Sequence, residues 1–161
     1  MHDEALFKDH LPREDCPICM LPLPLDLGAG SLGGSTYYTC CRKLICNGCM
    51  FRMILEEQRK KKEKGLCPYC RVPPCSDEEE VNINRLKTLS EKEDAEAIYL
   101  LAQYYAYGDS VIQIQQDWSK ANELWLKSGE LGSAEAYFHL SDSYNNGRGV
   151  EIDKKKAKHY L

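Results

Sequence analysis

The sequence lacks any long hydrophobic run. No apolar segment approaches the roughly 18 residues that a membrane-spanning helix needs, which argues against a membrane protein. Residues 1–15 contain no continuous apolar core, so no secretory signal is visible. We therefore expect a cytoplasmic or nuclear protein that is not secreted. Thiols stay reduced in these compartments, where many cysteines indicate metal binding or catalysis more often than disulfides.

Cysteine is absent after Cys75, although the chain of 161 residues contains nine. Charge changes near the same place. Residues 1–75 carry 11 Lys and Arg against 9 Asp and Glu, a net charge of +2, whereas residues 76–161 carry 10 against 16, a net charge of −6. Neither part is strongly basic, which argues against a nucleic-acid-binding protein. The shift falls at two consecutive prolines and predicts two structural parts.

The cysteines of the first part form four close pairs. The pairs are Cys16 with Cys19, Cys40 with Cys41, Cys46 with Cys49, and Cys67 with Cys70. Two intervening residues let one turn aim two thiolates at a single Zn²⁺. Eight thiolates suffice for two tetrahedral sites, so the pattern predicts two zinc ions, which so small a domain needs in order to fold. A redox motif and a disulfide framework are the alternatives, although an odd number of cysteines fits disulfides poorly.

The order of these pairs over residues 14–75 resembles a RING finger of the all-cysteine type. In that family, alternate pairs bind the same metal and produce a small α+β cross-braced fold. The resemblance implies one Zn²⁺ on Cys16, Cys19, Cys46 and Cys49, and a second on Cys40, Cys41, Cys67 and Cys70. The adjacent Cys40 and Cys41 depart from the family, which usually has one residue between these ligands. Cys75 is the alternative ligand if one of them cannot reach the metal.

The resemblance also implies a function. RING domains mostly serve as ubiquitin ligases, which bind a ubiquitin-charged conjugating enzyme and orient it without covalent chemistry of their own. By position, Ile18, Met53 and Pro68 would contact the conjugating enzyme, and Arg71 would position ubiquitin. The central helix is expected over residues 49–63, with Met50, Met53 and Ile54 on its inner face.

Two other functions are compatible with the same residues. One is a zinc-stabilised protein-interaction scaffold without ligase activity, which Met53 in place of an aromatic residue favours. The other is a nucleic-acid-binding zinc module, suggested by basic residues at 59–62 and 64. Glutamates interrupt that basic run and it contains no aromatic residue, so it is typical of a solvated helix face.

The second part contains an internal repeat. Ala97, Leu101, Tyr105 and Gly108 recur 39 residues later as Ala136, Leu140, Tyr144 and Gly147. Asp117, Lys120 and Ala121 recur 36 residues later as Asp153, Lys156 and Ala157. A period of this length with apolar residues at helical spacing predicts an all-α helical-repeat solenoid.

This repeat resembles the Sel1-like repeat, a protein-binding scaffold. We expect one copy over residues 94–132 and an incomplete copy over 133–161, binding a protein partner or substrate. Residues 1–13 are expected to be disordered. Residues 76–93 are expected to form a connecting helix that caps the solenoid and joins it rigidly to the zinc domain, through the apolar stripe Ile83, Leu86 and Leu89. The sequence stops within the second helix of the second copy, so it is either a fragment of a longer array or an uncapped one.

Overall fold

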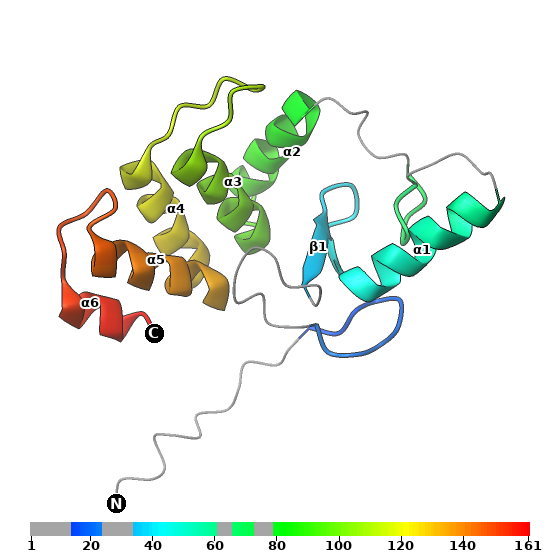
Figure 1. Cartoon of the computed structure of the whole chain (residues 1–161), viewed down its shortest axis with the longest axis horizontal. Helices are drawn as coiled ribbons and strands as arrows, with labels where there is room; N and C mark the ends of the chain where they lie inside the picture. The colour runs from blue at the N-terminus through cyan, green and yellow to red at the C-terminus, as the bar shows by residue number, and fades with distance from the viewer. Residues whose placement is uncertain (1–13, 24–33, 61–65, 73–78) are drawn as a thin grey trace, which may run out of the picture. The chain divides into compact units, whose positions relative to one another are not determined.

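The computed structural model describes residues 14–23, 34–60, 66–72 and 79–161 (Figure 1). Contacts divide the chain into two compact units, Met1–Val72 and Pro73–Leu161. The expected disorder of residues 1–13, the alternative ligand Cys75 and the end of the basic run at 61–64 lie outside the described residues. No helix in the described ranges is both long enough and apolar enough to cross a bilayer.

The first unit is a short β-hairpin followed by one helix. Strands β1 (Ser35–Tyr38) and β2 (Lys43–Cys46) pair in antiparallel fashion, with Ser35 opposite Cys46 and Tyr38 opposite Lys43. Helix α1 (Asn47–Lys60) begins directly after β2, two residues before the expected start. The Thr36 hydroxyl donates to Asn47 Oδ1 at 2.9 Å and thereby ties β1 to the first turn of α1.

Little apolar side chain is buried in the first unit. Its core is built on Cys16, Leu23 and Ile45, each less than one tenth exposed. One of these three residues is itself a candidate metal ligand. A core this small contributes little stability by itself. We therefore expect the fold of this unit to depend on metal binding by its cysteines.

The buried face of helix α1 differs in part from the face that its sequence predicts. Met50 and Met53 are half-buried, as expected. The expectation that Ile54 faces inward is wrong, because Ile54 is 38% exposed. Successive helix residues are turned by about 100°, so Ile54 lies about 40° around the helix from Met50 but about 100° from Met53, at the edge of the buried stripe on the side of Phe51. Phe51 and Leu55 lie on the same outer side as Ile54 and are also exposed.

The second unit is an array of helices packed in chain order. The helices are α2 (Glu79–Glu91), α3 (Ala95–Tyr107), α4 (Trp118–Glu130), α5 (Ala134–Asn146) and α6 (Lys154–His159). Each packs against the next, as Figure 1 shows from α2 to the red α6. Ala97, Ala121 and Ala136 are fully buried, because a small side chain at each position lets neighbouring helices approach closely. The unit is therefore a helical-repeat array.

Capping explains why one acidic residue recurs in this array. Asp117 precedes α4 and accepts a hydrogen bond from the backbone N–H of Lys120. Asp153 precedes α6 and accepts from the N–H groups of Lys155 and Lys156. Such a side chain satisfies helix N–H groups that have no partner within the helix. The recurring Asp therefore marks the start of the second helix in each repeat.

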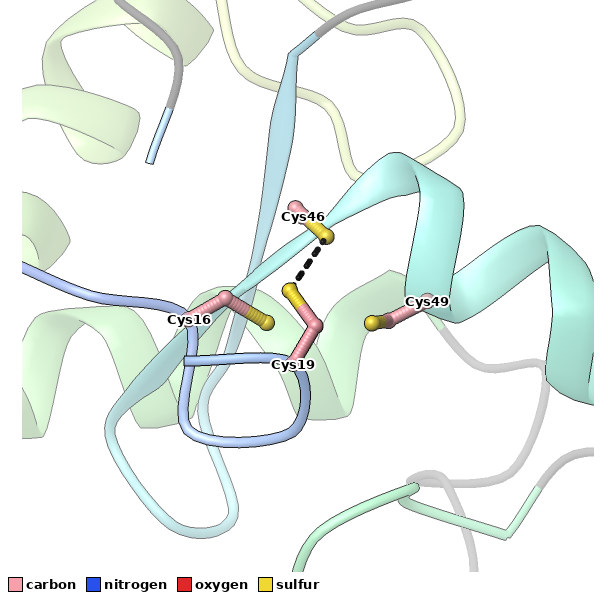
Figure 2. Close-up of side chains that lie close together, drawn as sticks. All are labelled: Cys16, Cys19, Cys46 and Cys49. Atoms are coloured by element: carbon pink, nitrogen blue, oxygen red, sulfur yellow. Dashed lines mark hydrogen bonds between the residues drawn. The ribbon is translucent and has the colours of Figure 1, made fainter. Parts of the chain in front are cut away.

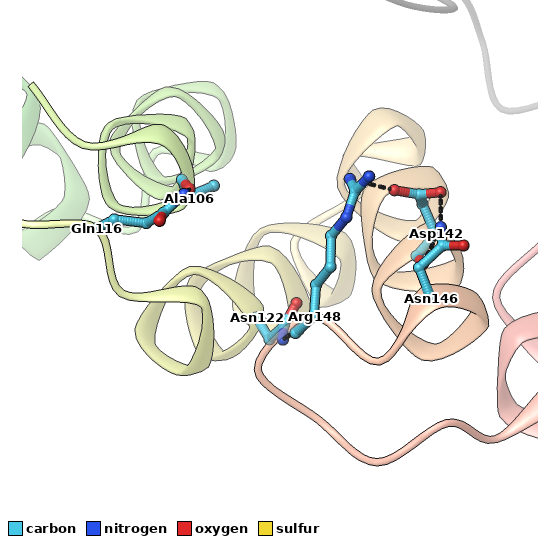
Figure 3. A network of polar contacts seen from close by, with 6 residues as sticks. All are labelled: Ala106, Gln116, Asn122, Asp142, Asn146 and Arg148. Carbon is cyan, nitrogen blue, oxygen red and sulfur yellow. Dashed lines mark hydrogen bonds and ion pairs between the residues drawn. The ribbon is translucent and has the colours of Figure 1, made fainter.

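The loop after α5 packs directly on the preceding repeat. Asn122 of α4 donates from Nδ2 to the Arg148 carbonyl at 2.7 Å, while the Arg148 side chain pairs with Asp142 at 2.8 Å (Figure 3). A Cβ on Gly149 would lie 2.5 Å from the Trp118 carbonyl carbon. Only glycine, which also accommodates the φ of +70° found there, permits this approach. The loop therefore fixes the spacing between the two repeats.

Helix α2 packs against α3. Its residues Ile83, Leu86 and Leu89 are all buried, which accounts for the apolar stripe seen in the sequence. With these three side chains buried, α2 covers the α3 end of the array. The rigid connection between this helix and the first unit stays a prediction.

Candidate metal centres

The first cysteine group is assembled from three separate elements. Cys16 and Cys19 lie in one turn, Cys46 ends β2 and Cys49 lies in the first turn of α1. Their four Sγ atoms lie within 4.8 Å of one another, and Figure 2 shows the side chains pointing toward a common centre. The Sγ atoms of Cys19 and Cys46 are 3.7 Å apart.

The second group contains both adjacent cysteines. Cys40 and Cys41 lie in the turn between β1 and β2, and Cys67 and Cys70 lie in a later turn. The four Sγ atoms again lie within 4.8 Å of one another. Cys41 is 3.7 Å from Cys67, and Cys40 is 3.5 Å from Cys70. Adjacent cysteines therefore reach a single centre here, and the eight residues fall into the two groups that the resemblance implies.

The two Cys-Pro-x-Cys turns have the same backbone structure. In the first, Cys16 N–H donates to Leu21 O at 2.8 Å, and Met20 N–H donates to Cys16 O at 2.9 Å. In the second, the equivalent bonds run from Cys67 N–H to Val72 O at 2.9 Å and from Arg71 N–H to Cys67 O at 3.0 Å. Each turn thus presents its two cysteine side chains in the same way.

The residue after each turn adopts a left-handed backbone. Met20 has φ +57° and Arg71 has φ +60°. This conformation costs a residue with a Cβ roughly 1–2 kcal/mol. The two hydrogen bonds that close each turn require it, so the strain follows from the geometry that directs the thiols.

The sulfur separations fit a tetrahedral metal site. Zn–S bonds of about 2.3 Å in a tetrahedron place the sulfur atoms about 3.8 Å apart. The observed Sγ–Sγ separations of 3.5 and 3.7 Å agree with that spacing and greatly exceed the roughly 2.05 Å of a disulfide. All eight cysteines are free thiols. Four sulfur ligands in a tetrahedron suit zinc or an iron–sulfur cluster, so both groups could hold a metal ion.

In each turn the pKa of the first cysteine lies below the ordinary value of a thiol. Burial alone tends to raise the pKa of Cys16, but backbone N–H groups, that of Cys19 first among them, donate to its sulfur and lower the pKa to about 6. The same balance, with the N–H of Cys70 foremost, lowers the pKa of Cys67 to about 7. One thiolate in each group is therefore ready to bind a cation near neutral pH.

Other members of each group are held protonated. Burial, followed by the neighbouring Cys67 thiol, raises the pKa of Cys41 to about 11. Burial, followed by the Cys46 thiol, raises the pKa of Cys49 to about 12. Thiolates at this distance repel one another, whereas a bound dication favours their ionised form. Metal binding must therefore release protons from both groups.

The residues expected to contact partners all lie in the first unit. Ile18 occupies the first turn and is 43% exposed. Pro68 in the second turn and Met53 on α1 are half-buried, while Arg71 is exposed. That these side chains form one surface stays a prediction.

Two features of the described residues were not predicted from the sequence. Met20 and Leu21 follow the first turn directly and are 72% and 63% exposed. Their place after a Cys-Pro-Ile-Cys motif was a signal that could have drawn attention to them. The second feature is His139, whose ring stacks on Trp125 with centroids 4.8 Å apart and whose Nε2 lies 3.2 Å from the Tyr99 hydroxyl. No sequence pattern indicated that contact.

Comparisons with known proteins identify the second unit. Residues 95–133 and 134–161 match the family model described as the Sel1 repeat. These two segments are thus Sel1 repeats, in agreement with the helical array of the second unit. Repeats of this kind imply protein–protein interaction. The boundaries of the matches differ by one residue from those expected.

Among solved structures, the chain is similar to a Sel1 repeat protein from Oxalobacter formigenes. The identity is 20% and the TM-score 0.47, over 50% of this chain. The matching region spans 60% of that protein's length. The search of curated proteins gives no match, and no match to a RING family model is found.

Proposed function

We propose that this protein is a RING-type E3 ubiquitin ligase. Its first unit would bind a ubiquitin-charged conjugating enzyme, and its Sel1 repeats would bind a protein partner or substrate. The observation that supports this most is the alternating use of the four cysteine pairs by two sulfur-only centres. That arrangement is the cross-brace that the resemblance implies, and it joins segments far apart in the sequence.

Zinc would have a structural role in this mechanism. The two groups of four cysteines would hold two Zn²⁺ ions, and a site with four protein ligands leaves no position open for substrate. The cysteines of the two Cys-Pro-x-Cys turns fix the backbone on which Ile18 and Pro68 stand. Rigid presentation of these side chains lowers the entropy lost when a partner is bound.

The partner-binding residues would act by positioning. Ile18, Met53 and Pro68 would form the apolar contact with the conjugating enzyme. Arg71 is exposed on a backbone held by its own hydrogen bond to Cys67, and its planar guanidinium can bridge two acceptors. Holding the charged conjugate in a reactive geometry can supply a large part of a rate enhancement.

A discharge assay tests this proposal. Full-length protein loaded with zinc is added to a panel of ubiquitin-charged conjugating enzymes, and loss of the thioester to free lysine is followed. We expect acceleration with at least one enzyme. Ile18→Ala should weaken binding of that enzyme. Arg71→Ala should leave binding nearly unchanged and slow discharge about tenfold or more, because an interaction made only in the activated complex affects the rate of the chemical step.

Arg52→Ala is the matched control, since Arg52 is an exposed arginine on α1 of the same unit. It should discharge ubiquitin at the rate of the unmodified protein. If the unmodified protein accelerates discharge with no enzyme in the panel, the zinc-stabilised interaction scaffold becomes the better description. A salt-dependent mobility shift with nucleic acid would instead favour the zinc module that binds nucleic acid.

A further inference from the structure

The loop between α3 and α4 distinguishes the first repeat from the second. It contains eight residues, 109–116, where the second repeat has five, 148–152. In Figure 1 it extends beyond the ends of both helices that it connects. The shorter loop also connects two helices of the array, so the extra length is not needed for the connection.

Residues 111–116 of this loop have the composition of a β-strand. They read Val-Ile-Gln-Ile-Gln-Gln, with three β-branched side chains and no charge, proline or glycine. β-Branched residues favour strands. Short uncharged segments of this kind pair with identical segments of other chains, and their glutamines align in hydrogen-bonded ladders. The described part of the chain has one named sheet, formed by β1 and β2, so the fold of the repeats does not use this pattern.

Asp109 closes the base of the loop. Its backbone exchanges two hydrogen bonds of 2.8 Å with Ile114. Its carboxylate accepts from the N–H groups of Val111 and Ile112 at 2.8 and 3.2 Å. The loop therefore holds its segment of β-strand composition in a defined conformation.

Several residues of the segment are available for contact. Val111 is 75% exposed, and Gln113, Gln115 and Gln116 are exposed as well. Among the described residues, the backbone groups of these three glutamines form no hydrogen bond with another backbone group. Exposed backbone groups in a segment of this composition are a template for pairing with another chain.

The partner that fits this segment is a second copy of the chain. Like charges on neighbouring strands destabilise a pair, but this segment carries none and can lie beside itself without repulsion. A two-fold pairing brings glutamine amides next to glutamine amides, whereas a strand of another protein would have to supply matching amides. Pairing also extends Gln113, whose φ of +55° lies in the left-handed region, and so relieves its strain.

We propose that residues 111–116 pair with the same segment of a second copy and join two chains into a two-fold symmetric dimer through a short intermolecular β-ladder. This inference does not depend on the ligase function, since it concerns the repeats alone. A two-stranded ladder is marginally stable in water, so the dimer is weak and forms at high protein concentration.

Sedimentation equilibrium over a wide range of concentration tests the dimer, using full-length protein with zinc under reducing conditions that prevent disulfides between copies. The unmodified protein should show a reversible equilibrium between monomer and dimer. Val111→Lys and Gln115→Lys should each raise the dissociation constant about tenfold or more, because each places like charges across the pair. Both side chains are exposed, so both variants should unfold at the temperature of the unmodified protein.

A mixture of Gln115→Lys with Gln115→Glu should recover the dimer, since opposite charges then lie across the pair. Ile152→Lys is the matched control. Ile152 is 63% exposed and lies in the loop of the second repeat, so the substitution removes exposed apolar surface and adds the same charge outside the segment. It should leave the dissociation constant unchanged.

A protein that stays monomeric at every concentration would overturn the inference. Association that is unchanged in both lysine variants of the segment would assign it to another surface. Equal weakening by Ile152→Lys, or a mixture that fails to recover the dimer, would assign the effect to net charge or to a disturbed loop. Each of these results would also overturn the inference, and none of them bears on the ligase function.

Discussion

His139 is an example of a single side chain whose environment changes its chemistry. It lies between the Trp125 ring and the Tyr99 hydroxyl, and Gln103 Nε2 in turn donates to that hydroxyl at 2.6 Å. Burial lowers the pKa of His139 below its ordinary value of 6.5, while the nearby carboxylates of Asp142 and Glu135 act in the opposite direction. The neutral imidazole is therefore the form that the folded repeats favour.

A pH dependence of stability follows from this pKa. Because the pKa is lower in the folded state, the unfolded chain binds more protons as the pH falls through about 6.5. The repeats should lose stability from there down to the folded-state pKa, and no further loss from this group is expected below it. Thermal unfolding followed by tryptophan fluorescence at pH 7.5, 6.5 and 5.5 measures this loss. Both tryptophans of the chain lie on α4, so the signal reports the repeats alone.

His139→Gln should reduce the fall in unfolding temperature between pH 7.5 and 5.5 by a few degrees. His159→Gln is the control, because His159 is exposed. An equal fall in both variants and in the unmodified protein would show that other groups cause the pH dependence.

Residue spacing predicted the metal groups because a tight turn fixes how near two thiols lie. It could not predict the contacts of His139 or the backbone conformation of Met20. His139 is partly buried by Trp125, a residue of another helix, and no local periodicity reports that contact. The left-handed backbone of Met20 follows from hydrogen bonds across the turn, which the identity of the residue does not encode. Each of these features depends on contacts outside the local pattern.

The positions of the helices along the chain were predicted more accurately than the faces that the helices bury. The recurring Asp, Ala and Gly positions placed the helices of both repeats, because caps and close helix contacts admit few residue types. Helix α1 was harder, since apolar residues lie on two sides of it. With Phe51, Ile54 and Leu55 outside and Met50 and Met53 partly buried, its sequence contains no single stripe from which to choose the buried face.

The loop from α5 to α6 tests how the repeats are joined. Gly149→Ala would place a Cβ 2.6 Å from Ser119 N and closer still to Trp118, on a backbone with φ +70°. Overpacking of this kind costs roughly 1–3 kcal/mol, in addition to the backbone strain. We expect a lower unfolding temperature of the repeats, measured by tryptophan fluorescence.

Gly132→Ala separates the two causes. Gly132 has φ +107°, but a Cβ there meets nothing within 4 Å, so only backbone strain is added. Equal destabilisation by the two substitutions would mean that the close approach of the loop to α4 does not add to the destabilisation caused by Gly149→Ala.

At the scale of the whole molecule, the two units differ in what stabilises them. The repeats bury Trp125, Leu140 and several alanines in a continuous core. Among the described residues of the first unit, the buried apolar side chains are Leu23, Ile45 and two of the cysteines, Cys16 and Cys67. Loss of metal should therefore affect the two units unequally.

Elemental analysis should find two zinc ions per chain. Structural zinc can contribute roughly 10–16 kcal/mol of apparent folding free energy. A strong chelator should therefore unfold the first unit, including α1, and leave tryptophan fluorescence and most of the helical circular dichroism intact. Adding zinc back should restore the lost ellipticity. One zinc or none, or a simultaneous loss of the fluorescence signal, would contradict this prediction.

The β-hairpin also bears on how the chain would bind two metal ions as it is synthesised. Cys16, Cys19, Cys40 and Cys41 precede Cys46 in the sequence, and a metal ion could join all four in a wrong tetrahedral site before Cys46 leaves the ribosome. Once residues 43–46 have emerged, the pairing of β1 with β2 opposes this wrong site. It sets Cys46 beside Ser35, whereas Cys40 and Cys41 lie in the turn beyond Tyr38, about 13 Å away along four residues of strand. Hairpins close within microseconds, far faster than translation. The paired strands can therefore separate Cys46 from Cys40 and Cys41 before a wrongly bound ion slows folding.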